Sequence, residues 1–173
     1  LIRSLSKHTK VPLRSFGVHG SISLGMHNPK SDIDISVYGA DNFTTVQRHL
    51  NALSKRDNEF SILEESIFDT LRRNRFLWDS RRVVVNATRN HDEIKERFGD
   101  LTYQATGRHL SFMSKVSDAT QSVFRPAIYA ISQFEPLDPQ SRMEEDTMPS
   151  EAVSMIGEFR GIASKGDRIK VSG

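Results

Sequence analysis

The feature of this chain that most constrains its fold is a glycine-serine pair followed, at the start of the next apolar segment, by two aspartates with one residue between them. The pair is Gly20-Ser21, and the aspartates Asp32 and Asp34 stand at the head of the apolar segment. Because side chains alternate between faces along a strand, the two carboxylates should project from one side while the apolar residues enter the core. The segment is therefore predicted to be a strand that displays two acids on one face.

This arrangement of side chains predicts a particular chemistry. Two neighbouring carboxylates repel each other, and a bound cation, expected to be Mg²⁺ or Mn²⁺, relieves that repulsion at neutral pH. The turn at Gly20-Ser21 offers backbone N–H groups and a hydroxyl to a phosphate. A phosphate-binding turn beside metal-binding carboxylates indicates phosphoryl or nucleotidyl transfer.

A known family carries the same pattern. The residues Gly20, Ser21, Gly25, Asp32 and Asp34 resemble the signature of the DNA polymerase β-like nucleotidyltransferase superfamily, especially its minimal prokaryotic members. The specific resemblance covers about residues 12–40. A longer string, residues 17–39, together with residues 124–129, is similar to archaeal predicted nucleotidyltransferases.

The resemblance implies roles for these residues. Asp32 and Asp34 would bind one or two Mg²⁺ or Mn²⁺ ions that bridge a nucleoside triphosphate such as ATP. Gly20 and Ser21 would hold its β- and γ-phosphates, and Gly25 would let the backbone pass close to the substrate. The implied activity is metal-dependent transfer of a nucleoside monophosphate from the triphosphate to a hydroxyl acceptor.

The loop between the two halves of the motif adds one more candidate. Lys30 could reach a phosphate of the nucleotide, and a solvated loop lysine is an equally good interpretation.

Two departures from the family pattern bear on activity. Ile22 and Leu24 follow the glycine-serine pair, where many minimal members have basic residues. The family also places a further carboxylate on a later strand, but Val85 and Asn86 occupy the expected positions, and Asp118 is the next acidic candidate. The predicted catalytic set is therefore Asp32, Asp34 and Asp118.

These departures leave an alternative function open. If Asn86 takes the position of the further carboxylate, its uncharged amide cannot accept a proton, and turnover would be slow or absent. The alternative is a weak or inactive nucleotide-binding or RNA-binding regulator that keeps the same fold. An antitoxin-like interaction module is a less favoured third interpretation.

A cluster of arginines is a candidate for acceptor binding. Guanidinium groups near aromatic side chains suit phosphates and bases, so the cluster could hold a nucleic acid or the triphosphate. The competing interpretation is a solvated helix end whose cations favour its dipole. The residues concerned are Arg72, Arg73, Arg75, Arg81 and Arg82, around Phe76 and Trp78.

The hydrophobic pattern predicts an α/β (α+β) chain. Helices are expected at residues 1–10, 41–53, 61–71 and 91–98, with strands at 16–19, 32–38 and 82–87, which gives a nucleotidyltransferase-type mixed sheet with helices on one side. From residue 106 the pattern becomes strand-like, with a hairpin turn expected at 164–167 between strands 159–162 and 168–171. The predicted domains are residues 1–105 and a small β-rich, barrel-like domain at 106–173.

Composition restricts the setting of the protein. The 173 residues include no cysteine, which excludes disulfides and thiolate metal sites, and no apolar run reaches the ~20 residues of a membrane helix. We therefore expect a cytoplasmic protein without a membrane partner. The chain begins with leucine, which indicates that residues precede it in the natural protein, and a net charge of +2 is too small to predict nucleic-acid binding by itself.

Overall fold

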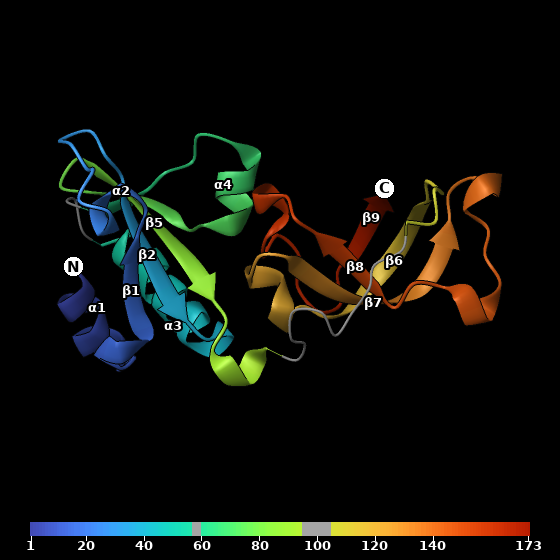
Figure 1. Ribbon diagram of the computed structural model, residues 1–173, viewed down its shortest axis with the longest axis horizontal. Helices are drawn as coiled ribbons and strands as arrows, with labels where there is room; N and C mark the ends of the chain where they lie inside the picture. The colour runs from blue at the N-terminus through green and yellow to red at the C-terminus, as the bar shows by residue number, and fades with distance from the viewer. Residues whose placement is uncertain (57–59, 95–104) are drawn as a thin grey trace. The chain divides into compact units, whose positions relative to one another are not determined.

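The computed structural model describes residues 1–56, 60–94 and 105–173 (Figure 1). The chain divides into two compact units, Leu1–Glu93 and Ile94–Gly173. Each unit has its own sheet, so each is described by itself. The predicted domain boundary between residues 105 and 106 stays a prediction.

The first unit is built around a mixed sheet of five strands. Their order is β1-β2-β5-β4-β3, with β2 and β5 parallel and the other neighbours antiparallel. The strands are β1 Phe16–His19, β2 Ile33–Tyr38, β3 Phe60–Ile62, β4 Arg75–Trp78 and β5 Arg81–Thr88. The predicted mixed sheet is confirmed, with β5 as the middle strand and β2 between β1 and β5.

The helices α1 and α3 of the first unit lie on one side of this sheet. The helix α3 packs along the sheet behind β2 and β5 in the view of Figure 1, and α1 packs against α3. The elements are α1 Ile2–Thr9, the 3₁₀ turn η1 Leu13–Ser15, α2 Gly20–Ser23, α3 Ala40–Leu53, α4 Ile67–Arg72 and η2 His91–Glu93. The helices predicted at residues 1–10 and 41–53 are therefore confirmed.

Strand alternation gives the central strands one buried and one open face. Ile35 and Val85, from the parallel pair, are 0% and 1% exposed and lie on the face covered by α3, whose Val46 and Leu50 are fully buried. At 25 cal/mol per Å² of apolar surface, burying each such side chain contributes about 1.5–3 kcal/mol. The alternate residues, including Asp34, are consequently directed to the opposite face, which is where the predicted site lies.

The second unit is a four-stranded antiparallel sheet in the order β8-β7-β6-β9. Its strands are β6 Ser111–Asp118, β7 Ala127–Pro136, β8 Glu151–Ser154 and β9 Arg168–Ser172, joined by the 3₁₀ turns η3 Thr120–Val123, η4 Pro139–Ser141, η5 Glu145–Thr147 and η6 Gly157–Phe159. Phe112, Val116 and Ile131 form the centre of its core. The region predicted to be β-rich is thus confirmed as such, with β8 and β9 at the two edges of the described sheet.

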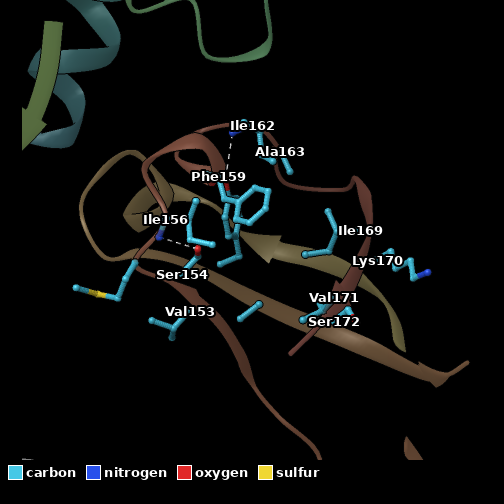
Figure 2. Close-up of a pocket in the computed structure, with 13 residues that line it drawn as sticks. Val153, Ser154, Ile156, Phe159, Ile162, Ala163, Ile169, Lys170, Val171 and Ser172 are labelled. Carbon is cyan, nitrogen blue, oxygen red and sulfur yellow. Dashed lines mark hydrogen bonds between the residues drawn. The ribbon is translucent and has the colours of Figure 1, made fainter. Parts of the chain in front are cut away.

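An apolar pocket of about 700 Å³ lies in the second unit. The loop that carries Phe159 and Ile162 lies over the strand that bears Ile169 and Val171 (Figure 2). The hydroxyl of Tyr129 holds this loop, because it donates to the Phe159 carbonyl at 2.6 Å and accepts from the Ile162 N–H at 3.1 Å. The pocket therefore depends on one buried tyrosine for its shape.

Two predicted elements are corrected by the structure. The helix expected at residues 61–71 is instead strand β3 followed by the short helix α4, in which Ile67 and Leu71 are 65% and 48% exposed. The cause is that Phe60 and Ile62 pair with β4, while Ser66 caps the later helix by accepting from the Asp69 N–H. A short strand and a capped helix together imitated one long amphipathic helix.

The hairpin expected around residues 164–167 is also wrong. β9 pairs with β6, 50 or more residues earlier, and the segment expected to be its partner, residues 159–162, begins at the last residue of the 3₁₀ turn η6 and is not a strand. Of the helix expected at residues 91–98, the structure gives the 3₁₀ turn η2, and residues 95–98 lie outside the described part of the chain. Within the described residues, no helix is both long and apolar enough to cross a bilayer.

Candidate active site

The carboxylate of Asp34 lies directly over Gly20. A Cβ built on Gly20 would stand 2.5 Å from Oδ2 of Asp34, which is closer than real Cβ contacts. Gly20 also has a φ of +68°, in the left-handed region that favours glycine. Two independent constraints, space and backbone conformation, therefore require glycine here, and they bring the two halves of the predicted motif together.

Strand pairing explains this contact. His19 is the residue opposite Asp34 in the antiparallel ladder of β1 and β2, and β1 ends at that pair. The chain turns at Gly20 into the single-turn helix α2, in which the Ser23 hydroxyl donates to the Gly20 carbonyl at 2.9 Å. Ser21 follows immediately in α2 and is partly exposed.

Gly25 serves the turn rather than a close approach. It has the same φ of +68°, but a Cβ there would have nothing within 4 Å. The turn is closed by hydrogen bonds from the Gly25 N–H to the Ile22 carbonyl at 3.2 Å and from the Met26 N–H to the Ser21 carbonyl at 2.9 Å. Glycine at this position is therefore explained by backbone conformation alone.

The two aspartates are suited to a hydrated cation. Asp32 immediately precedes β2, two residues from Asp34, and both are partly exposed. Among the described residues neither carboxylate has an ion-pair or hydrogen-bond partner, so their charges are not balanced by the protein. Within the part of the chain that the structure describes, no group of three or more His, Cys, Asp or Glu side chains is placed to hold a metal.

Two carboxylates nevertheless fit Mg²⁺. That ion keeps several waters and is commonly bound by one or two carboxylates together with substrate phosphates, rather than by an all-protein cage. Within residues 1–56, 60–94 and 105–173, Asp34 has no ion-pair partner, so its carboxylate oxygens are available for such a role. The donor set therefore suits a metal that arrives with a polyphosphate.

The strand next to β2 carries no acid. β5 places Val84 opposite Asp34 and Asn86 opposite Ser36, and Val85, considered for a further carboxylate, is 1% exposed and belongs to the buried face. Across the five described strands of this sheet, Asp34 is the sole acidic residue. Any further acid at this site must therefore come from outside the sheet.

One contact at the site, between Asn86 and His19, was not predicted from the sequence. The Nδ2 of Asn86 lies 3.3 Å from Nε2 of His19, joining β5 to the residue just before Gly20. From sequence, His19 is more simply a half-buried strand histidine, and its distance in the chain from Asn86 hides the contact. The pairing of both strands with β2 is the signal that brings them together.

Asp118 lies in the other unit, at the end of β6. Its carboxylate accepts from the Thr120 hydroxyl at 2.9 Å and from the Thr120 N–H at 3.3 Å. These contacts give Asp118 a local role in ending the strand, and its role as a further catalytic carboxylate stays a prediction.

Lys30 lies on the exposed loop before β2. Its N–H donates to the side chain of Asn28 at 2.8 Å, and the Asn28 N–H donates to the Ser31 hydroxyl at 3.0 Å. This small turn fixes the backbone of the loop while the lysine side chain remains exposed. The structure is compatible with both interpretations of Lys30.

The arginine cluster does not form a single surface. Pairing of β4 with β5 puts Arg75 opposite Val84, on the face that displays Asp34, whereas Arg81 is opposite Trp78 on the other face. Phe76, considered for base stacking, is 0% exposed and stacks on Phe60, with ring centroids 5.1 Å apart. It therefore belongs to the core and is not available to a nucleic acid.

Two of the arginines are held in ion pairs. Nη1 of Arg75 lies 3.2 Å from Oδ1 of Asp69 and 3.8 Å from Oε2 of Glu65, and Nη2 of Arg82 lies 2.7 Å from Oε1 of Glu65. Of the remaining members, Arg73 donates from Nε to the Thr70 carbonyl at 3.3 Å. The positive charge of the arginine cluster is therefore partly neutralised by Glu65 and Asp69.

Asp69 is the buried anchor of this network, with 3% of its surface exposed. Burial by itself would raise the pKa of Asp69, but hydrogen bonds from Ser66 and Arg75, and the charges of Arg75 and Arg72, outweigh it and hold that pKa below its usual value. Asp69 is consequently ionised at neutral pH and fixes Nη1 of Arg75.

Comparison with known proteins gives two findings. Residues 2–91 match a family model described as nucleotidyltransferase domain. The chain is also similar to an uncharacterized protein of Methanocaldococcus jannaschii, MJ1086, with 28% identity over 183 residues that cover 94% of this chain and 51% of the relative. The chain thus spans about half the length of this relative, and the family match coincides with the unit that carries Gly20 and Asp34.

Proposed function

This chain belongs to the nucleotidyltransferase domain family, and on that premise we propose that it transfers a nucleoside monophosphate from a nucleoside triphosphate such as ATP to an acceptor hydroxyl. The observation that carries the proposal is the approach of the Asp34 carboxylate to the backbone of Gly20. It supports the proposal because a carboxylate oxygen beside a turn with N–H groups is suited to a metal-bound polyphosphate.

Asp32 and Asp34 would hold the Mg²⁺ or Mn²⁺. When bound, such an ion draws charge from the phosphoryl oxygens and makes the α-phosphorus easier to attack. The residues fit the ion because both carboxylates lack a cationic partner among the described residues and are partly exposed.

The other residues of the site orient the nucleotide. Gly20 and Ser21 would donate to the β- and γ-phosphates, and Lys30 would supply a positive charge from its exposed loop. Gly25 would maintain the turn that follows them. In this arrangement the protein contributes mainly by positioning, which accounts for much of the rate enhancement in phosphoryl and nucleotidyl transfer.

A specific observation favours a second candidate, the weak or inactive nucleotide-binding or RNA-binding regulator. The strand beside Asp34 presents Val84 and Asn86 in place of an acid, so the described sheet offers no carboxylate to take the proton of an acceptor hydroxyl. Asp118 remains our candidate for that role in the enzyme. Asp118→Asn should lower the rate of transfer without changing nucleotide affinity if the assignment is right.

The test of the proposed function is nucleotide binding measured by thermal denaturation. The wild-type protein should be stabilised by at least one of the four nucleoside triphosphates in the presence of Mg²⁺ or Mn²⁺, and not by the triphosphate with EDTA. Saturation at 100 times the dissociation constant corresponds to about 2.7 kcal/mol of stabilisation, which is readily measured. The variant with both Asp32→Ala and Asp34→Ala should lose this effect.

A control separates the site from general charge effects. Asp41→Ala removes an exposed carboxylate of the same unit, in the first turn of α3, and should leave nucleotide stabilisation unchanged. Metal-dependent stabilisation that persists in the double variant would contradict the proposed site. Binding that is normal without any transfer of labelled nucleotide would select the regulator.

A further inference from the structure

We propose that Arg75 binds a phosphate group of the acceptor, so that the acceptor is a phosphorylated molecule whose hydroxyl is presented to the nucleotide. The identification of the bound molecule as the acceptor rests on the proposed function, whereas binding of its phosphate to Arg75 does not require the metal. It narrows the predicted arginine cluster to one residue with a defined position.

The position of Arg75 follows from strand register. Asp34 on β2 is opposite Val84 on β5, and Val84 is opposite Arg75 on β4, so the three residues form one row across the same face of the sheet. Neighbouring strands are about 4.8 Å apart, which separates the backbones of Asp34 and Arg75 by roughly 10 Å. Because the residue between them is an apolar valine, no charge intervenes in that row.

The guanidinium of Arg75 is held from one side. Both carboxylate oxygens of Asp69 contact Nη1, at 3.2 and 3.3 Å, and Oε2 of Glu65 lies 3.8 Å from the same atom. Among the described residues, Nε and Nη2 have no hydrogen-bond partner, and 28% of the side chain remains exposed. A planar group fixed through one nitrogen, with other N–H donors open, is suited to bind a phosphate by a pair of parallel hydrogen bonds.

The acids around Arg75 explain why the site would be selective. Ion pairs join Arg75 and Arg82 to Asp69 and Glu65, so the positive charge of these two arginines is largely neutralised within the network. Directed donors rather than excess charge would hold the ligand. Asp69 is almost fully buried, and both of its carboxylate oxygens contact Nη1 of Arg75, so the guanidinium is held in a fixed orientation.

The geometry also limits the size of the acceptor. A hydroxyl beside Asp34 and a phosphate on Arg75 would be separated by a distance of the order of that between the two backbones, roughly 10 Å. A phosphorylated sugar meets this limit, and so does the terminal nucleotide of a nucleic acid. Both present the same chemistry, a hydroxyl and a phosphate on one sugar.

The experiment measures binding by equilibrium dialysis in EDTA, without nucleoside triphosphate, using four labelled probes. Ribose 5-phosphate and a dinucleoside 3′,5′-monophosphate carry the phosphate, and ribose and a nucleoside lack it. We expect the wild-type protein to bind at least one phosphorylated probe, at least about tenfold more tightly than its unphosphorylated partner, since hydrogen bonds to charged groups have about this effect. Preference between the two phosphorylated probes distinguishes a free phosphate ester from a nucleic-acid end.

Variants assign the binding to Arg75. Arg75→Ala should weaken it about tenfold or more, and Arg75→Lys should weaken it less, because lysine keeps the charge and the pairing with Asp69 but loses the planar donors. Arg75→Lys also guards against misfolding of the alanine variant, in which Asp69 would be buried unpaired. Arg81→Ala, an exposed arginine on the other face of the same sheet, is the matched control and should bind as the wild type does.

The outcomes separate this inference from the proposed function. Equal binding of phosphorylated and unphosphorylated probes, no binding of either phosphorylated probe, or unchanged binding in both Arg75 variants overturns the inference, even when metal-dependent nucleotide binding is intact. Conversely, the variant lacking Asp32 and Asp34 should still bind the phosphorylated probe. Loss of nucleotide binding alone would therefore contradict the proposed function and leave the phosphate site standing.

Discussion

The contact between Gly20 and Asp34 can be tested by adding a single methyl group. In Gly20→Ala the backbone keeps a φ of +68°, which costs an L-residue about 1–2 kcal/mol. The new Cβ would also stand 2.5 Å from Oδ2 of Asp34, so the carboxylate must rotate away at a further cost of about 0.5–1.5 kcal/mol. We expect a total loss of about 1.5–3.5 kcal/mol in the free energy of unfolding, together with loss of metal-dependent nucleotide binding.

Gly25→Ala is the matched control for stability. It has the same φ, and its Cβ would meet nothing within 4 Å, so only the backbone cost of about 1–2 kcal/mol applies. The difference between the two variants, measured by urea denaturation, isolates the clash with Asp34. Gly107→Ala, with a φ of +69° and open space, lies in the other unit and is the control for nucleotide binding.

A double-mutant cycle makes the test decisive. When Asp34 is already alanine, Gly20→Ala has no carboxylate to displace, and its cost should fall to that of Gly25→Ala. The coupling energy between the two positions should then be about 1 kcal/mol, above the usual error for independent sites. Equal costs for Gly20→Ala and Gly25→Ala, with zero coupling to Asp34 and nucleotide binding retained, would refute the reasoning.

The remaining predictions concern stability. Folding lowers the pKa of Asp69, so ionised Asp69 contributes fully to the free energy of unfolding above pH 3.8, and this contribution is lost as the pH falls through the lower pKa of the folded state. In Asp69→Asn the free energy of unfolding should therefore decrease less steeply as the pH is lowered in the acid range. Burial, and then the charge of His8, lower the pKa of His49, so stability should fall on acidification below pH 6.5; His8→Gln should reduce that fall in thermal melts, and an unchanged pH dependence would contradict the assignment. Tyr129→Phe should cost about 1–2 kcal/mol and speed amide exchange at Ile162, and a variant as stable and as protected as the wild type would show that the hydroxyl does not hold the loop.

The local sequence pattern was sufficient to predict the two main parts of the site, the aspartate strand and the glycine-serine turn. Alternation along the strand at residues 33–38 places Asp34 opposite to the buried Ile35, and no tertiary contact is needed for that inference. The glycine-serine turn could also be predicted, because a backbone position with positive φ favours glycine, and Gly20 has such a φ. Amphipathic spacing likewise located α3.

Segments with short or ambiguous periodicity misled the same reasoning. Leu63, Ile67 and Leu71 stand at helical spacing, but Ile67 and Leu71 are exposed, and the segment begins inside the three-residue strand β3. The apolar residues near Phe159 alternate like a strand, but the Tyr129 hydroxyl binds their backbone in place of a partner strand. Local pattern could not decide these cases, because burial depends on which neighbour is present.

Strand order was decided by tertiary structure alone. The parallel pairing of β2 with β5 set Val84 and Asn86 beside the aspartate strand, brought Asn86 to His19, and removed Val85 to the core. The pairing of β4 with β5 put Arg75 and Arg81, six residues apart in sequence, on opposite faces. A sequence specifies which side of its own strand a residue takes, but pairing with distant strands chooses its neighbours, and those neighbours determine what the site can bind.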